Sequence, residues 1–115
     1  MKHIVKQTFE RIRDFVDPLL IPNNYQLTVA TIEGEQSGNL LTEQLVLAVG
    51  AKGNYRFHYS PATNRFIYLS PVSGSQQYVY DIDEKTWVGY RDGHDFFGIL
   101  TRDLIRHSIG LPKIS

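Results

Sequence analysis

The chain has 115 residues, with twelve basic and twelve acidic side chains and therefore a formal net charge of zero. This length allows one hydrophobic core, and the neutral charge argues against a duplex-DNA-binding protein or a polybasic membrane anchor, which need a strong positive excess. The absence of cysteine excludes disulfide scaffolds, zinc ribbons and thiol catalysis, and no apolar run approaches the roughly 18 residues of a membrane span.

An amphipathic helix is predicted over residues 4–20, where apolar residues recur in steps of four and three along one face. Pro18 predicts that this helix ends or kinks near Asp17, because the residue before a proline disfavours the helical conformation. A wide apolar stripe predicts a second helix at about residues 95–108.

Between the two helices, short apolar or alternating segments bounded by turn residues predict six strands. Their ranges are 25–32, 41–49, 54–60, 65–70, 77–82 and 86–91. Successive strands joined by short turns form an antiparallel meander, and both helices need a surface to bury against. The predicted fold is therefore α+β: a two-layer sandwich with the N- and C-terminal helices side by side on one face of a six-stranded sheet. The whole chain, residues 1–115, is expected to form this single domain.

Acidic residues form the first pattern that could carry chemistry. Glu10, Asp14 and Asp17 are spaced four and three apart, so they share one edge of the first helix. Glu33 and Glu35 follow the first strand, which is expected to run beside that helix. Exposed carboxylates bind hard cations such as ferrous iron, magnesium or calcium weakly. The alternative interpretation is a solvated helix face.

The fourth predicted strand is the second pattern. It contains Phe66, Ile67 and Tyr68 in succession, and neighbouring side chains of a strand point to opposite faces. If Ile67 faces the helices, Phe66 and Tyr68 face the open side of the sheet, beside Arg65. Such a patch is typical of a protein-docking surface or a platform for single-stranded nucleic acid. The alternative is a sheet whose outer face is merely rich in tyrosine.

Two segments of the chain share a motif with one protein family. The first is the run from Asn64 to Gly74, and the second is Trp87-Val88 followed by Asp92-Gly93 and a leucine-bearing helix. Both resemble the frataxin family, whose central strand and turn read Asn-Lys-Gln-Ile-Trp-Leu-Ser-Ser-Pro-x-Ser-Gly. The chain keeps Asn64, Ile67, Leu69, Ser70, Pro71, Ser73 and Gly74, with one residue fewer before the proline. The close resemblance covers about residues 55–108, and the N-terminal half agrees in element order.

The resemblance implies a small, non-enzymatic, iron-binding factor of iron–sulfur cluster assembly. Such proteins dock on the complex of a cysteine desulfurase and its scaffold protein and modulate sulfur transfer, in a mitochondrial or mitochondrion-derived matrix or in a bacterial cytoplasm. Neither a nucleic acid nor a membrane is expected as a partner. By this resemblance the iron-binding residues are Glu10, Asp14, Asp17, Glu33 and Glu35, and the partner-binding residues are His58, Asn64, Arg65, Phe66 and Tyr68. Trp87 takes the position of the family's buried tryptophan.

The chain also departs from the family. His58 stands where the family has a docking asparagine, Tyr68 stands where it has an exposed tryptophan, and the net charge is zero where frataxins are usually acidic. The neutral charge and the altered third strand favour a second hypothesis, a structural accessory subunit of a ribosome or respiratory complex that has lost iron binding. A third is weak ferroxidase or iron-storage activity.

Overall fold

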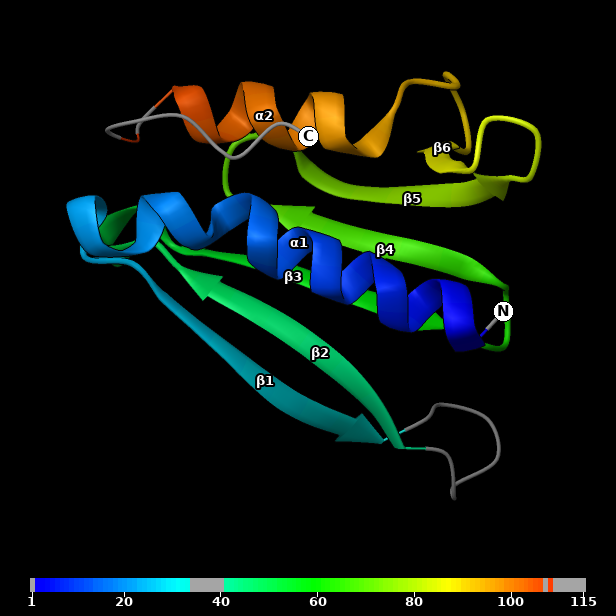
Figure 1. Ribbon diagram of the computed structural model, residues 1–115, viewed down its shortest axis with the longest axis horizontal. Coiled ribbons are helices and arrows are strands. Elements are labelled where there is room, and N and C mark those ends of the chain that lie inside the picture. The colour runs from blue at the N-terminus through cyan, green and yellow to red at the C-terminus, as the bar shows by residue number, and fades with distance from the viewer. Residues whose placement is uncertain (1, 34–40, 107, 109–115) are drawn as a thin grey trace.

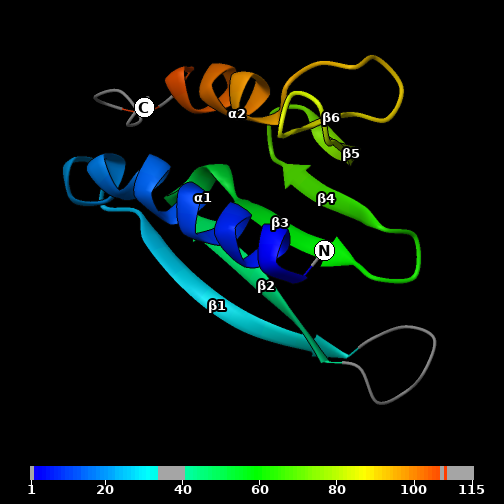
Figure 2. The same cartoon turned by 45° about the vertical axis from the view of Figure 1, so that its right-hand side comes forward.

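The computed structural model describes residues 2–33, 41–106 and 108, apart from the side chains of residues 2, 30–33 and 41–43. The elements in chain order are α1 (Lys2–Asn23), β1 (Gln26–Glu33), β2 (Leu41–Ala48), the short 3-10 helix η1 (Gly50–Lys52), β3 (Asn54–Ser60), β4 (Arg65–Ser70), β5 (Gly74–Asp81), β6 (Thr86–Gly89) and α2 (Phe96–Ile105). Each strand pairs antiparallel with its neighbour in sequence, in one six-stranded sheet. Both helices lie on the same side of this sheet (Figures 1 and 2), so the predicted two-layer sandwich is confirmed.

The first helix continues past both of its prolines. Pro18 and Pro22 lie inside α1, so of the two outcomes predicted near Asp17, an end or a kink, the end is wrong. Each proline leaves the carbonyl four residues earlier without its helical partner. Both proline side chains and Asp14 are exposed, so this side of the helix faces water, which can bind the freed carbonyls. The described part of the chain has no helix with both the length and the apolar character that crossing a bilayer requires.

A turn with a left-handed residue ends α1. Asn24 has φ 56°, Tyr25 N donates to Leu20 O at 2.8 Å, and Asn24 N donates to Ile21 O at 3.2 Å. This pattern is the Schellman motif, which pairs two of the last helical carbonyls and redirects the chain into β1.

The core consists of aromatic side chains on the inner face of the sheet and apolar side chains of both helices. Ring contacts join the layers: Phe96 of α2 packs edge-on against Phe57, Phe66 and Tyr68, at centroid distances of 6.1, 5.2 and 5.4 Å. The two helices contact each other through Phe15 and Phe97, whose ring centroids are 5.3 Å apart. Such edge-to-face pairs add to the hydrophobic stabilisation from the buried area.

The facing of β4 is the opposite of the sequence-based expectation. Phe66 and Tyr68 are both 0% exposed and face the helices, whereas Ile67 and Leu69 point to the uncovered side. The expectation that Phe66 and Tyr68 lie on the open side is therefore wrong. The physical reason is size: burying the two aromatic rings removes more apolar area from water than burying the two aliphatic side chains.

Trp87, the tryptophan that the family resemblance places in the core, is 2% exposed. Its indole Nε1 donates a hydrogen bond to Thr8 Oγ1 at 2.8 Å, and its ring lies 5.4 Å from that of Phe66. Thr8 in turn donates to Ile4 O at 2.7 Å. The buried indole N–H is therefore satisfied, and β6 is tied to the first half of α1.

A buried carboxylate links α2 to the turn between β4 and β5. Asp103 is 0% exposed, and its Oδ2 accepts hydrogen bonds from Tyr68 Oη (2.7 Å), Ser70 Oγ (2.9 Å) and Ser73 Oγ (2.7 Å). Ser70 Oγ also accepts from the backbone N–H of Val72 and Ser73, which closes the turn. We call this group of four side chains the Asp103 latch. It gives both serines of the Ser-Pro-x-Ser motif a structural role.

Candidate functional site

The uncovered side of the sheet carries a stripe with an apolar centre and polar flanks. His58 of β3 lies opposite Ile67 of β4, which lies opposite Gln77 of β5. Leu69, next to Ile67 on this face, lies opposite Arg56. We call these five residues the open face. Both helices pack on the other side of the sheet (Figure 1), so neither of them covers the side chains of the open face.

The structure brings some of the predicted partner-binding residues to this surface and removes others. His58 is half-buried within the open face, and Arg65 lies at its edge. Asn64 occupies the β3–β4 turn with φ 55° and accepts a hydrogen bond from Tyr59 Oη. Phe66 and Tyr68 lie in the core, so they present no area to a partner. The sequence-based interpretation missed Ile67, which takes the central place instead.

The pairing of the β3–β4 hairpin contained the signal that was missed. Ser60 pairs with Arg65, which places Tyr59 opposite Phe66 and Phe57 opposite Tyr68. Directly opposite residues share a face, so the aromatic residues of both strands must be buried or exposed together. A four-residue turn at Pro61–Asn64 pairs Ser60 with Arg65, and counting outward from that pair shows which residues of β3 and β4 share a face. The family resemblance instead placed the one-residue deletion just before Pro71, and this reversed the expected facing of β4.

The predicted iron-binding residues are only partly described. Glu10, Asp14 and Asp17 are all exposed on α1. Asp14 and Asp17 border a hollow of about 440 Å³ between α1 and β1, together with Arg13. Glu33 has no described side chain, and Glu35 lies outside the described residues. In the ranges that the structure covers, no three His, Asp or Glu side chains gather as a metal site. Iron binding by these five residues therefore stays a prediction.

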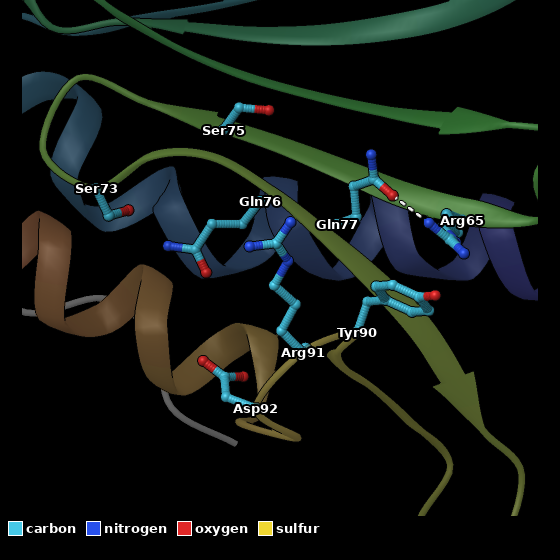
Figure 3. Close-up of a pocket in the computed structure, with 9 residues that line it drawn as sticks. Arg65, Ser73, Ser75, Gln76, Gln77, Tyr90, Arg91 and Asp92 are labelled. Carbon is cyan, nitrogen blue, oxygen red and sulfur yellow. Dashed lines mark hydrogen bonds between the residues drawn. The ribbon is translucent and has the colours of Figure 1, made fainter.

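A polar cavity of about 600 Å³ opens far from β1, beside β5 and the loop between β6 and α2. We call it the edge pocket; it is lined by residues that include Arg65, Ser75, Gln77, Tyr90, Arg91 and Asp92. The Arg65 guanidinium lies 3.7 Å from the centroid of the Tyr90 ring, and its Nη1 donates to Gln77 Oε1 at 2.5 Å (Figure 3). The sequence alone did not single out this pocket, because its residues are scattered over 28 positions between Arg65 and Asp92.

The buried tyrosines near the latch act as hydrogen-bond donors rather than as acids. Burial raises the pKa of Tyr78 to about 12. Burial also raises the pKa of Tyr68 far above its ordinary value, with the neighbouring Asp103 carboxylate adding to the effect. Both hydroxyls therefore keep their protons at neutral pH, and Tyr68 can donate to Asp103 throughout the physiological range.

Comparison with known proteins gives one family and two relatives. The model of the frataxin-like domain matches residues 2–109. The chain is 36% identical over 59 residues to the mitochondrial frataxin homolog of Schizosaccharomyces pombe, which covers 51% of this chain and 37% of that protein. It is 33% identical over 101 residues to the mitochondrial frataxin of Dictyostelium discoideum, which covers 88% of this chain and 48% of that protein. The matched part of the chain thus spans less than half the length of either relative.

Proposed function

Because the chain belongs to the frataxin family, we propose that it is a non-enzymatic factor of iron–sulfur cluster assembly. In this proposal it docks on the complex of a cysteine desulfurase and its scaffold protein and modulates sulfur transfer. The mitochondrial names of both relatives support a mitochondrial or mitochondrion-derived matrix as its location. A bacterial cytoplasm is the alternative.

The observation that carries the docking proposal is the open face. Ile67 and Leu69 form an apolar centre that neither α1 nor α2 covers, and Arg56, His58 and Gln77 surround it with polar and cationic groups. An apolar centre within a polar rim is the usual anatomy of a protein interface. Ile67 takes the role that the family resemblance had given to Tyr68, the outward side chain at the middle of the sheet.

We also propose weak iron binding along α1 and the end of β1. Glu10, Asp14 and Asp17 are exposed, so a cation there competes with water for the carboxylates. Arg13 lies between them in sequence and borders the same hollow as Asp14 and Asp17, so it opposes cation binding. Glu33 and Glu35 are the remaining proposed ligands. Iron is thus a loosely held ion in this proposal, and the chain carries out no redox reaction by itself.

A structural accessory subunit is the second candidate function. The formal net charge of zero favours it, because frataxins are usually strongly acidic and a negative surface attracts cations. In this case the open face would bind a ribosomal or respiratory-complex subunit instead of a desulfurase complex. The two functions share the surface and differ in the partner.

The experiment measures binding of the protein to the organism's own cysteine desulfurase and scaffold by titration calorimetry. Ile67→Ala is expected to weaken this binding about tenfold, as a moderate interface anchor does. Ile82→Ala is the matched control, because Ile82 has the same side chain and is 78% exposed in the β5–β6 turn. Absence of binding by the unsubstituted protein, with recovery of ribosomal or respiratory subunits in a pull-down, would favour the second function.

A further inference from the structure

On the side of β5 that faces away from β4, only part of the strand is paired with β6. β6 pairs with β5 from Tyr78 to Asp81, and Tyr90 N adds one more bond, to Gln77 O at 2.9 Å. The chain then turns back, with Gly93 N donating to Gly89 O at 2.9 Å, and leads into α2. The first part of β5, from Gly74 to Gln76, therefore has β4 on one side and the edge pocket on the other.

The backbone of Ser75 points into this pocket. Successive residues of a strand direct their N–H and C=O groups alternately to the two sides. The carbonyl of Gln77 points away from β4, since Tyr90 binds it from the β6 side. Ser75, two residues earlier, directs both its N–H and its C=O the same way. Among the described strands none pairs with Ser75 on that side. An open strand edge of this kind is a template for a further strand.

The pocket is also cationic. Arg91 is exposed and has no acidic partner within the described part of the chain. Figure 3 shows its side chain extending from the β6–α2 loop toward β5. Arg65 is held in place by Tyr90 and Gln77, and part of its guanidinium remains for a further acceptor. Asp92 is the acidic residue among the lining residues that the structure describes; it accepts a hydrogen bond from His94 N at 3.0 Å, and its Oδ2 lies 3.5 Å from His94 Nδ1.

We propose that the edge pocket binds an extended segment of a partner protein that carries an aspartate or glutamate side chain. The segment lies antiparallel or parallel to β5 and forms main-chain hydrogen bonds with the N–H and C=O of Ser75. Its carboxylate pairs with Arg91, and Arg65 is the second cation within the pocket. Main-chain pairing provides affinity, and the two arginines select for negative charge. This site adjoins the open face and shares Gln77 with it, but it uses the main-chain groups of β5 and two arginines instead of the apolar centre formed by Ile67 and Leu69.

The test is a chemical-shift titration of the ¹⁵N-labelled 115-residue chain with a blocked peptide, acetyl-Thr-Val-Glu-Val-Thr-amide, at millimolar concentrations. The peptide with glutamine in place of glutamate is the matched probe. We expect saturable shifts of the amides of Ser75, Gln77 and Arg91 with the first peptide, and binding about fivefold weaker with the second, the effect of one exposed ion pair. No desulfurase or scaffold is present, so the result does not depend on the proposed function.

Two substitutions separate the main-chain and charge contributions. Ser75→Pro removes the N–H that points into the pocket and leaves the bonds to β4 in place, because proline is tolerated where its nitrogen faces away from the sheet. It should abolish saturation by the peptide. Arg91→Ala should weaken binding about fivefold, whereas Lys6→Ala on α1 removes the same charge elsewhere and should leave binding unchanged. Arg91→Glu, at an exposed position where folding is not at risk, should abolish binding and is the decisive variant if Ser75→Pro lowers the melting temperature.

Three results would overturn this proposal. The first is a lack of shifts at Ser75 and Gln77 at millimolar peptide. The second is a set of shifts centred on Ile67 and Leu69 of the open face. The third is unchanged binding by Arg91→Glu together with unchanged binding by a folded Ser75→Pro.

Discussion

Replacing Asp103 by alanine tests the Asp103 latch most directly. The substitution removes one buried carboxylate and leaves the hydroxyls of Tyr68, Ser70 and Ser73 without the acceptor that they share. A hydrogen bond to a charged group contributes about 1.5–3 kcal/mol. The three bonds share a single oxygen, so their contributions do not add fully.

The magnitude also depends on the charge that the substitution removes. Burying an ionised carboxylate costs several kcal/mol, and its removal offsets part of the lost hydrogen bonding. Asp103 Oδ1 offsets little of this burial cost, because it accepts no hydrogen bond among the described residues and its ion pair, 3.5 Å from Nη2, is with the half-exposed Arg102. We therefore expect Asp103→Ala to lower the free energy of unfolding by about 2–4 kcal/mol. A domain of this size has about 5–15 kcal/mol in total.

Urea denaturation followed by tryptophan fluorescence and circular dichroism measures this change, and the melting temperature should fall by about 10 °C. Two further variants separate the contributions of the charge and of a single hydrogen bond to the free energy of unfolding. Asp103→Asn keeps an acceptor oxygen without charge and should lose about half as much, since bonds to a charged acceptor are roughly twice as strong. Ser73→Ala removes one donor and should cost about 1 kcal/mol. An unfolding free energy of Asp103→Ala within about 1 kcal/mol of the unsubstituted protein would refute the latch as a stabilising group.

Three other predictions concern the core, alkaline pH and iron. Trp87→Ala should cost about 3–5 kcal/mol and largely unfold the protein, which an absent thermal transition in circular dichroism would show. Stability should fall as the pH rises above 10, because tyrosines of the unfolded chain lose their protons near pH 10.0 whereas burial raises the pKa of Tyr78 to about 12 in the folded state. Tyr78→Phe should flatten this decline in urea titrations at about pH 9 and 11, and an unchanged slope would speak against it. Ferrous iron should broaden the NMR signals of Glu10, Asp14 and Asp17 more strongly at low ionic strength, whereas broadening at the histidines would contradict this placement.

Local patterns were sufficient for most of the secondary structure. The apolar steps of α1 and the alternation in β3 and β4 reflect which face of an element is buried, and this is a property of neighbouring residues. The start of α2 is equally local: Asp95 caps the helix by accepting from Gly98 N at 3.1 Å, at the residue where the helix was predicted to begin. The end of α1 was different, because the tolerance of Pro18 depends on which side of the helix is exposed.

The two faces of β4 show where local information ends. Phe66 and Tyr68 alternate with Ile67 and Leu69, and all four are large and mostly apolar, so alternation separates the two sets without identifying the buried one. The pairing with β3 decides between them, since it joins Phe66 and Tyr68 to the aromatic residues of the neighbouring strand. The open face and its central Ile67 follow from that pairing.

The sequence by itself determined the order of elements, the two-layer fold, the family and the buried position of Trp87, because these depend on periodicity, turns and a contiguous motif. Only the tertiary structure decided which side chains meet across long separations. Asp103 lies 30 residues after Ser73 and 35 after Tyr68 in the chain, and only the packing of α2 against the sheet brings them within hydrogen-bond distance. Likewise, Arg65 and Arg91 share the edge pocket because β6 is shorter than β5 and the chain turns away at Tyr90. Contacts of this kind depend on strand register and strand length, which are settled by the free energy of the whole fold rather than by any one segment.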